Sequence, residues 1–141
     1  MKIESVLAAK GPAVFTIDPL ATVRNAAEIL AGNNIGALVV LDAGGSPVGI
    51  LSERDIVREI SRNPGVLDAT VGETMTSGIL TGNPGDDVEA LLRTMTDRHF
   101  RHLPIVEHGK LIGMVTLGDL VRVQLSELEG AVETLTIQLM N

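Results

Sequence analysis

The sequence lacks cysteine, tryptophan and tyrosine, and its only aromatic residues are Phe15 and Phe100. Without cysteine the chain can form no disulfide and offers no thiolate as a nucleophile or metal ligand, so the redox compartment stays open. Without a series of aromatic side chains it has no platform on which the bases of single-stranded nucleic acid could stack. The core must therefore consist of aliphatic side chains, which the hydrophobic fraction of 45% can supply.

Positive charge is also scarce. The chain has 11 lysine and arginine residues against 18 aspartate and glutamate residues, which gives a net charge of −7. This balance argues against binding to nucleic acid or to an anionic membrane. No apolar run reaches membrane-spanning length, and Glu4 lies where a signal peptide would be apolar. We expect a soluble, cytoplasmic protein.

An internal repeat organises the chain. A segment of glycine, two apolar residues, a hydroxyl residue, two variable residues and aspartate occurs at 49–55 and again at 113–119, 64 positions later. Upstream, matching residues recur at a spacing of 65: Pro19 with Pro84, Val23 with Val88, and Leu38 with Leu103. The one-residue difference falls in two polar, glycine-bearing turns, where a deletion is tolerated best. The sequence therefore predicts two copies of one small unit.

Each unit has the same predicted order of elements: strand, helix, strand, strand, helix. In the first unit, residues 14–17 form a short strand, and a helix begins after Thr22 as its N-cap and ends at 33–34. The run 37–41 is apolar throughout, as in a strand buried on both faces. Residues 48–51 form the third strand, and the second helix starts near Ser52.

In the second unit, residues 79–81, 103–106 and 111–115 are the expected strands. Asp86 is expected to open the intervening helix, with Glu89 three residues later at the spacing of a capping box. Pro104 has no N–H for a β-ladder, so we expect it at a sheet edge or at the first residue of its strand. Short lead-in segments, 3–7 and 71–75, open the two units ahead of their first strands, and 62–65 is the break between the units.

The two units are expected to pack against each other. One unit of this size would expose an apolar sheet face and would be marginally stable alone. Two units packed sheet to sheet bury that face. The sequence predicts an α/β (α+β) fold of tandem β-α-β-β-α repeats with pseudo-twofold symmetry. The first unit spans 1–65, the second spans 66–125, and a C-terminal amphipathic helix spans 126–141.

The strand-to-helix corner of each unit carries the chemistry. Its hydroxyl and aspartate project near a helix N-terminus, where free N–H groups and the helix dipole favour an anion. The carboxylate could accept hydrogen bonds from the vicinal hydroxyls of a ribose, and the glycine of the motif would let a ligand approach the strand backbone closely. A purely structural interpretation is also open, in which Ser52 and Thr116 only cap their helices. Two copies in register favour a ligand site.

These motifs resemble those of the cystathionine-β-synthase (CBS) domain family. The similarity to a pair of CBS domains covers about residues 1–125, and its most specific parts are 49–55, 71–75 and 101–106. Members of that family bind AMP, ADP, ATP and sometimes NAD or S-adenosylmethionine in two clefts between the repeats. The resemblance implies a regulatory, energy-sensing module with AMP as the first choice of ligand. Such a module acts through a partner or through its own oligomer.

The resemblance also assigns residues to two clefts. The cleft ranked first contains Thr16, Ile17, Ile35, Gly36, Ala37, Arg101, His102, Met114, Thr116, Gly118 and Asp119. It ranks first because Arg101 and His102 supply a phosphate end for which the first unit has no matching cation. The second cleft contains Ser52, Arg54, Asp55, Leu80, Thr81 and Phe100, and it shares Arg101. Replacing Asp119 by alanine is expected to weaken binding by about 1.5–3 kcal/mol. An ordinary pKa for His102 would make phosphate affinity depend on pH near neutrality.

An apolar stripe follows the second unit. Its residues recur at alternating spacings of four and three, as in a heptad a/d seam: Val121, Leu125, Leu128, Val132, Leu135 and Leu139. Gly130 weakens this helix. A stripe of this kind needs a partner to bury it, so we expect a homodimer.

Three classes of function stay open at this point. The first is a nucleotide-sensing module that acts on an unknown effector protein, and the second is a dimerisation or interaction module that binds no ligand. The third is a nucleotide-converting enzyme, which has little support because the chain has no Ser-His-Asp set, no metal-ligand spacing and no phosphate-binding Gly-Lys-Ser/Thr loop. We expect no catalytic residue and no metal site.

Overall fold

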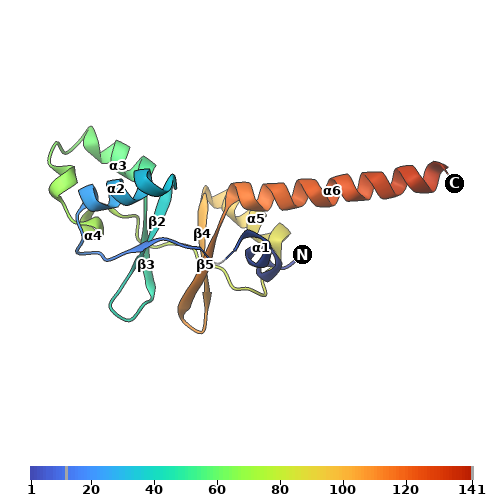
Figure 1. Cartoon of the computed structure of the whole chain (residues 1–141), viewed down its shortest axis with the longest axis horizontal. Coiled ribbons are helices and arrows are strands. Elements are labelled where there is room, and N and C mark those ends of the chain that lie inside the picture. Colours follow the sequence, from blue (N-terminus) through green and yellow to red (C-terminus); the bar gives the residue numbers. More distant parts are fainter. Residues whose placement is uncertain (12, 141) are drawn as a thin grey trace.

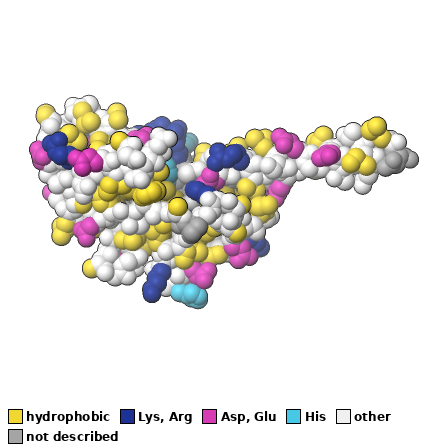
Figure 2. Space-filling view, in the orientation of Figure 1, with side chains coloured by type: hydrophobic (Ala, Val, Ile, Leu, Met, Phe, Trp, Pro, Cys, Tyr) yellow, Lys and Arg dark blue, Asp and Glu magenta, His cyan; other side chains and the backbone are white. Residues whose placement is uncertain are grey.

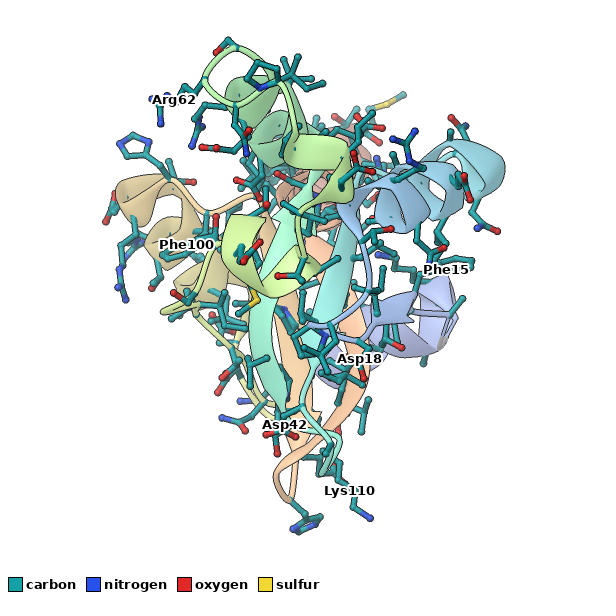
Figure 3. The ribbon with its side chains drawn as sticks, turned by 90° about the vertical axis from the view of Figure 1, so that its left-hand side faces the viewer. Phe15, Asp18, Asp42, Arg62, Phe100 and Lys110 are labelled. Atoms are coloured by element: carbon teal, nitrogen blue, oxygen red, sulfur yellow. The ribbon has the colours of Figure 1, made fainter. Side chains whose placement is uncertain are left out.

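The computed structural model describes residues 1–11 and 13–140. Its elements are α1 (Ile3–Lys10), β1 (Thr16–Ile17), α2 (Val23–Asn33), β2 (Ala37–Leu41), β3 (Pro47–Ser52), α3 (Glu53–Ile60), the 3-10 turn η1 (Val66–Asp68), α4 (Val71–Thr74), α5 (Val88–Arg98), β4 (His102–Glu107), β5 (Lys110–Thr116) and α6 (Leu117–Met140). Figure 1 shows the strands at the centre of the body, with α2, α3 and α4 outside one sheet and α1 and α5 outside the other. In the perpendicular view the β2–β3 hairpin lies in front of β4–β5, so the two sheets stack face to face (Figure 3). The predicted α+β pair of repeats is confirmed.

The first repeat forms as its sequence predicts. Strand β1 pairs in parallel with β2, which pairs antiparallel with β3. The Thr22 hydroxyl caps α2 by accepting the N–H of Asn25 at 3.1 Å, and Asn34 ends the helix in the left-handed region at φ 52°. Ala37 to Val40 are all buried, because helices cover one face of β2 and the second sheet covers the other.

The predicted strand at 79–81 is wrong, and Pro104 explains why. In the first repeat the N–H of Val39 donates to the carbonyl of Phe15 at 3.1 Å. Pro104 lies 65 positions after Val39 and has no N–H to donate, so the equivalent hydrogen bond cannot form. What is left is a single parallel bridge between Gly82 and Ile105. Strand β4 is consequently an outer strand of a two-stranded sheet, which agrees with the edge position expected for proline.

The predicted N-cap of α5, the first long helix of the second repeat, is wrong by one residue. Asp87, and not Asp86, is the N-cap of α5, and its carboxylate accepts the N–H of Ala90 at 3.0 Å. The Asp86 carboxylate turns back and accepts the N–H of Asn83 at 2.8 Å, which closes the preceding turn. Glu89 does not complete a capping box but lies 3.4 Å from Arg93 on the helix surface.

The two lead-in segments are exchanged between the repeats. Ile3 and Val6 of α1 are buried in the core of the second repeat, while Val71 of α4 is buried in the core of the first. This exchange accounts for the glycines of the repeated motif: a Cβ at Gly113 would lie 2.8 Å from Leu7, and one at Gly49 would overlap Met75. The close approach to the strand backbone is therefore made by the lead-in side chains, and not by a ligand as expected.

The last helix extends beyond the body of the protein. Helix α6 runs without a break from Leu117 to Met140, so the segment expected at 126–141 continues the helix that follows β5. Leu120 is buried in the second core, but the described residues beyond 124 are all exposed (Figure 1). None of the helices within 1–11 and 13–140 has the length and apolar character needed to cross a membrane.

Candidate functional site

Both strand-to-helix corners are closed by their own hydroxyl and carboxylate groups. At the start of α3 the Ser52 hydroxyl accepts the N–H of Asp55 at 3.2 Å, and Asp55 Oδ2 accepts the N–H of Ser52 at 2.9 Å. At the start of α6, Thr116 and Asp119 exchange the equivalent bonds at 3.1 and 2.9 Å. Ser52 and Thr116 thus cap their helices, and the caps use one oxygen of each carboxylate. The other oxygen of each is held differently in the two repeats.

The second oxygen of Asp55 has a neutral partner. Asp55 Oδ1 accepts the hydroxyl of Thr76 at 3.2 Å, and Thr76 is held there by two backbone hydrogen bonds to Ile50, at 2.9 and 3.0 Å. Among the described residues no lysine or arginine forms an ion pair with Asp55. A hydroxyl donor at this distance is weak enough to be replaced by a hydroxyl group of a ligand.

A cavity of about 540 Å³ opens beside Asp55. It is lined by Gly36, Ile50, Ser52, Glu53, Arg54, Asp55, Arg58, Thr76, Ile79, His99, Phe100, Arg101 and His102. The lining therefore comes from both repeats: the β3–α3 corner on one side, and the segment joining α5 to β4 on the other. Its volume lies within the usual range of small-molecule sites.

Basic side chains gather in this cavity although the chain as a whole is acidic. Arg54 and Arg58 come from α3, and Arg101 comes from the start of β4. Phe100 contributes an apolar wall, and the guanidinium of Arg98 lies 5.3 Å from the centre of its ring. Three arginines around one opening provide the charge that a phosphate needs.

His102 lies between the two corners. A Cβ at Gly36 would lie 3.8 Å from its Nε2, so the imidazole faces the first repeat. Burial, and then the charges of Lys10 and Arg101, lower the pKa of His102 below its ordinary value, against the opposing effect of Asp55 and Asp119. This lowered pKa favours the neutral form of His102 at neutral pH, contrary to the ordinary pKa expected from the sequence.

This lowered pKa predicts a pH dependence of stability. The unfolded chain takes up a proton at His102 as the pH falls through about 6.5, while the folded protein takes it up only at a lower pH, so stability is lost as the pH falls through that window. Between pH 7.5 and 5.5 we expect the free energy of unfolding to fall further in the wild type than in His102→Gln. The additional loss in the wild type should be less than about 1 kcal/mol. Urea titrations at both pH values measure this difference, with His108→Gln, an exposed histidine, behaving like the wild type.

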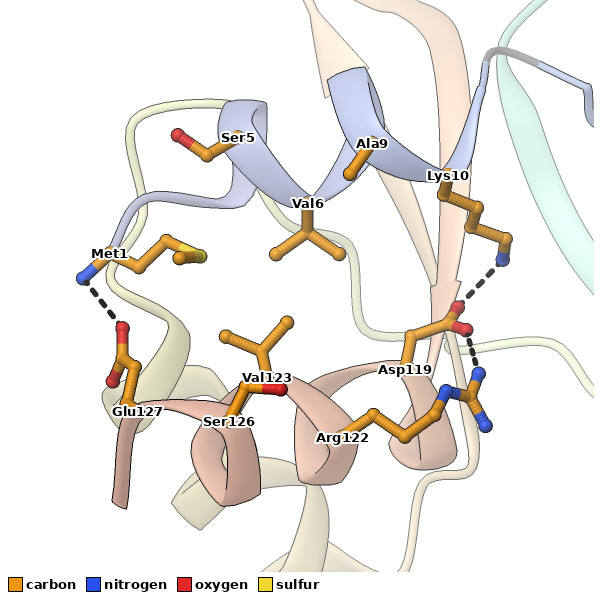
Figure 4. A pocket seen from close by; sticks show the side chains of 10 residues that line it. All are labelled: Met1, Ser5, Val6, Ala9, Lys10, Asp119, Arg122, Val123, Ser126 and Glu127. Atoms are coloured by element: carbon orange, nitrogen blue, oxygen red, sulfur yellow. Dashed lines mark hydrogen bonds and ion pairs between the residues drawn. The ribbon is translucent and has the colours of Figure 1, made fainter. Parts of the chain in front are cut away.

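The surroundings of Asp119 are different. Lys10 Nζ donates to Asp119 Oδ2 at 2.7 Å, and Arg122 donates to Oδ1 at 2.6 Å. Asp119 also lines one end of a second cavity of about 560 Å³ between α1 and α6, whose walls include Val6, Ala9 and Val123 (Figure 4). Burial raises the pKa of Asp119, but the hydrogen bonds from Lys10 and Thr116 outweigh it and hold the pKa below its ordinary value.

The residues assigned to the cleft ranked first do not surround one cavity. Gly36, Arg101 and His102 line the cavity beside Asp55, whereas Asp119 lines the cavity between α1 and α6. The others lie elsewhere around the two corners. Ile17 and Ala37 are buried, Ile35 packs on the first core, and Thr16 and Gly118 are exposed. The carbonyl of Met114 accepts a hydrogen bond from Lys10, and Thr116 caps α6.

The residues assigned to the second cleft are brought together more closely. Ser52, Arg54, Asp55 and Phe100 all line the cavity beside Asp55. Leu80 packs against the second core, and Thr81 is exposed next to Gly82.

Sequence reasoning missed several residues of this cavity. From the sequence, Arg58 fits the solvated face of its helix and His99 fits a solvated helix end. Thr76 gave no signal, because its position depends on the exchange of the lead-in segments. His99 enters the cavity because it ends α5 in the left-handed region, at φ 60°. Only the packing of one repeat on the other could reveal these contributions.

The fold and its two corners define a tandem-repeat α+β protein with a cavity between the repeats. The family model for the CBS domain matches residues 10–62 and 71–126. The chain belongs to the CBS domain family.

Individual relatives agree with this assignment. The chain is 34% identical over 123 residues to the CBS domain-containing protein YhcV of Bacillus subtilis, covering 87% of this chain and 86% of that protein. A 37% identical match to an uncharacterized 17.7 kDa protein of Acidianus ambivalens covers 77% of this chain and 66% of that protein.

Two solved structures are also similar. The CBS-domain protein ATU1752 of Agrobacterium tumefaciens has a TM-score of 0.83 at 33% identity, covering 88% of this chain and 99% of that one. CBSX2, solved in complex with AMP, has a TM-score of 0.69 at 30% identity, covering 80% and 88% of the two chains.

Proposed function

We propose that this chain is a regulatory module that binds an adenine nucleotide, with AMP as the first candidate, in the cavity beside Asp55. The observation that carries the proposal is the combination of Asp55, whose outer oxygen accepts the hydroxyl of Thr76 and no other side chain of residues 1–11 and 13–140, with three arginines around one opening. A ribose offers the hydroxyl donors that suit the carboxylate, and a phosphate suits the arginines.

Each part of the cavity has a role in the proposed complex. Asp55 accepts a ribose hydroxyl in place of Thr76, while Ser52 and the N-terminus of α3 hold the carboxylate in position. Arg54, Arg58 and Arg101 receive the phosphate. The apolar side chains of the lining, Ile50, Ile79 and Phe100, provide the surface for the adenine ring.

A solved relative supports the choice of ligand. CBSX2, 30% identical to this chain, is described in complex with AMP. ADP, ATP, NAD and S-adenosylmethionine share the adenosine group that the Asp55 carboxylate would hold, so they are the natural competitors. The proposal gives no residue a catalytic role.

The proposed ranking of the two clefts is the reverse of the one drawn from sequence. Arg101 and His102 were expected to serve Asp119, but both line the cavity beside Asp55. The two oxygens of Asp119 already accept bonds from Lys10 and Arg122.

A panel of ligands tests the proposed function. The melting temperature of the chain should rise when AMP is added at concentrations above the Kd of the complex. Inorganic phosphate at the same concentration should not raise it. If no adenine nucleotide in the panel changes the melting temperature or gives heat on titration, the chain is an interaction module without a ligand, and the proposal is wrong.

We also propose that a second copy of the chain covers the apolar stripe of α6. Leu125, Leu128, Val132 and Leu135 are between 52% and 62% exposed, and the stripe is visible as yellow atoms along the projecting helix (Figure 2). Most helical stability in proteins comes from packing of an apolar face, so the exposed stripe favours a partner. Leucine at d and valine at one a position favour pairing of two helices.

The dimer can be tested by placing charges on the stripe. Changing both Leu128 and Leu135 to aspartate should convert a dimer into a monomer in light scattering, because it buries like charges in the seam. Thr134→Asp, an exposed change off the seam, should leave the mass unchanged. A wild-type chain that is already monomeric at high micromolar concentration would contradict the proposed dimer.

The effector protein and the cytoplasmic location stay predictions. The sensing output would be a change in the packing of the two repeats on each other, since the cavity is lined by both.

A further inference from the structure

The two repeats bring equivalent segments to their aspartates. Thr76 follows α4 and is hydrogen-bonded to the backbone of Ile50, and its hydroxyl reaches Asp55. Lys10 ends α1 and donates to the carbonyl of Met114 at 2.8 Å, and its ammonium reaches Asp119. Ile50 and Met114 are 64 positions apart, which is the spacing of the repeat. Thr76 and Lys10 therefore lie in comparable places beside the two aspartates, and both come from the exchanged lead-in segments. They are not at equivalent sequence positions, because Leu7 and Met75 pack on the equivalent glycines and align Thr76 with Ala8.

Thr76 and Lys10 differ in how strongly they bind the neighbouring aspartate. The hydroxyl of Thr76 makes a neutral donor bond of 3.2 Å to Asp55, while the ammonium of Lys10 makes an ion pair of 2.7 Å with Asp119. The side chain of Asp119 is only 11% exposed, so water screens this pair weakly. Charge-assisted bonds are about twice as strong as neutral ones.

Both oxygens of Asp119 accept hydrogen bonds, and two of the three donors are cations. Its Oδ2 accepts from Lys10 and from the N–H of Thr116, and its Oδ1 accepts from Arg122. A ribose hydroxyl competes with two cations for the Asp119 carboxylate, whereas the side-chain donors that it meets at Asp55 are hydroxyl groups.

We propose that Lys10 is a built-in occupant of the Asp119 carboxylate, which closes this half-site to a nucleoside and leaves one nucleotide site per chain. The inference rests on the proposed function, because it assumes that the open counterpart beside Asp55 is the site that binds. It assigns to Lys10 a role that depends on α1 crossing to the second repeat.

The test is a calorimetric titration of AMP into single and double variants. The wild type should bind one AMP per chain, and Lys10→Ala should bind two. Asp55→Ala should bind AMP about 10- to 150-fold more weakly than the wild type, and the double variant Lys10→Ala with Asp55→Ala should have one site at least about tenfold tighter than Asp55→Ala alone. Lys110→Ala removes an exposed lysine of the β4–β5 hairpin and should behave like the wild type.

The outcomes separate the two proposals. Unchanged binding by Asp55→Ala would refute the proposed nucleotide site, whatever Lys10 does. A double variant that binds no better than Asp55→Ala would refute the role of Lys10, whatever Asp55 does. Should Lys10→Ala fail to fold, Asp119→Asn in the otherwise wild-type chain decides the matter: one site of unchanged affinity supports the inference, and a tenfold loss of AMP affinity overturns it.

Discussion

Replacing Asp55 by alanine is expected to weaken AMP binding by about 10- to 150-fold, or about 1.5–3 kcal/mol. The change removes the charged acceptor for the ribose, and it leaves Arg54, Arg58 and Arg101 to hold the phosphate alone. Asp55→Asn keeps an oxygen that can accept the N–H of Ser52, so it should preserve the helix cap and lose less affinity. Isothermal titration calorimetry gives both affinities.

Two comparisons make this prediction specific. Asp97→Asn changes an exposed carboxylate of α5 outside the cavity and should bind AMP like the wild type. Loss of the cap in Asp55→Ala should lower stability by about 1 kcal/mol, which a urea titration measures separately. Equal AMP affinity in Asp55→Ala and the wild type would show that the carboxylate does not contact the ligand.

Replacing Ile3 by alanine should lower the free energy of unfolding by about 2–5 kcal/mol. The side chain is completely buried in the core of the second repeat, with Val88, Leu103 and Leu120. The effect is large because a cavity forms where the exchanged helix α1 closes the core. Urea denaturation measures the loss, and Leu20→Ala, which is 81% exposed in the wild type, should change stability by less than about 0.5 kcal/mol.

The location of the damage tests the exchange of the lead-in segments. Hydrogen exchange in Ile3→Ala should accelerate first at amides of β4 and β5, in the second repeat, although Ile3 precedes the first. Faster exchange confined to β2 and β3 would mean that α1 packs on its own repeat.

The internal repeat was enough to predict the arrangement of the two sheets and the position of both corners. The spacing of 64 between Asp55 and Asp119 identified equivalent sites, and the apolar run at 37–41 identified a strand buried on both faces. These features depend on local patterns, which sequence reveals directly.

What the sequence could not reveal depends on contacts between distant segments. Pro104, which lacks the N–H for the equivalent hydrogen bond, abolishes a strand whose own residues, 79–81, look suitable for one. Lys10 neutralises Asp119 from a helix 109 positions earlier in the chain. A pattern of matching residues treats the two aspartates as equivalent, and only the packing of α1 on β5 distinguishes them.

Chemical-shift mapping of AMP binding tests the central claim most directly. In spectra of the ¹⁵N-labelled chain, AMP should shift the amides of Gly36, Asp55, Thr76 and Arg101, which surround the cavity. The amides of Thr116 and Gly118 beside Asp119 should stay near their starting positions. Shifts centred on Thr116 and Gly118, with none around Asp55, would contradict the account.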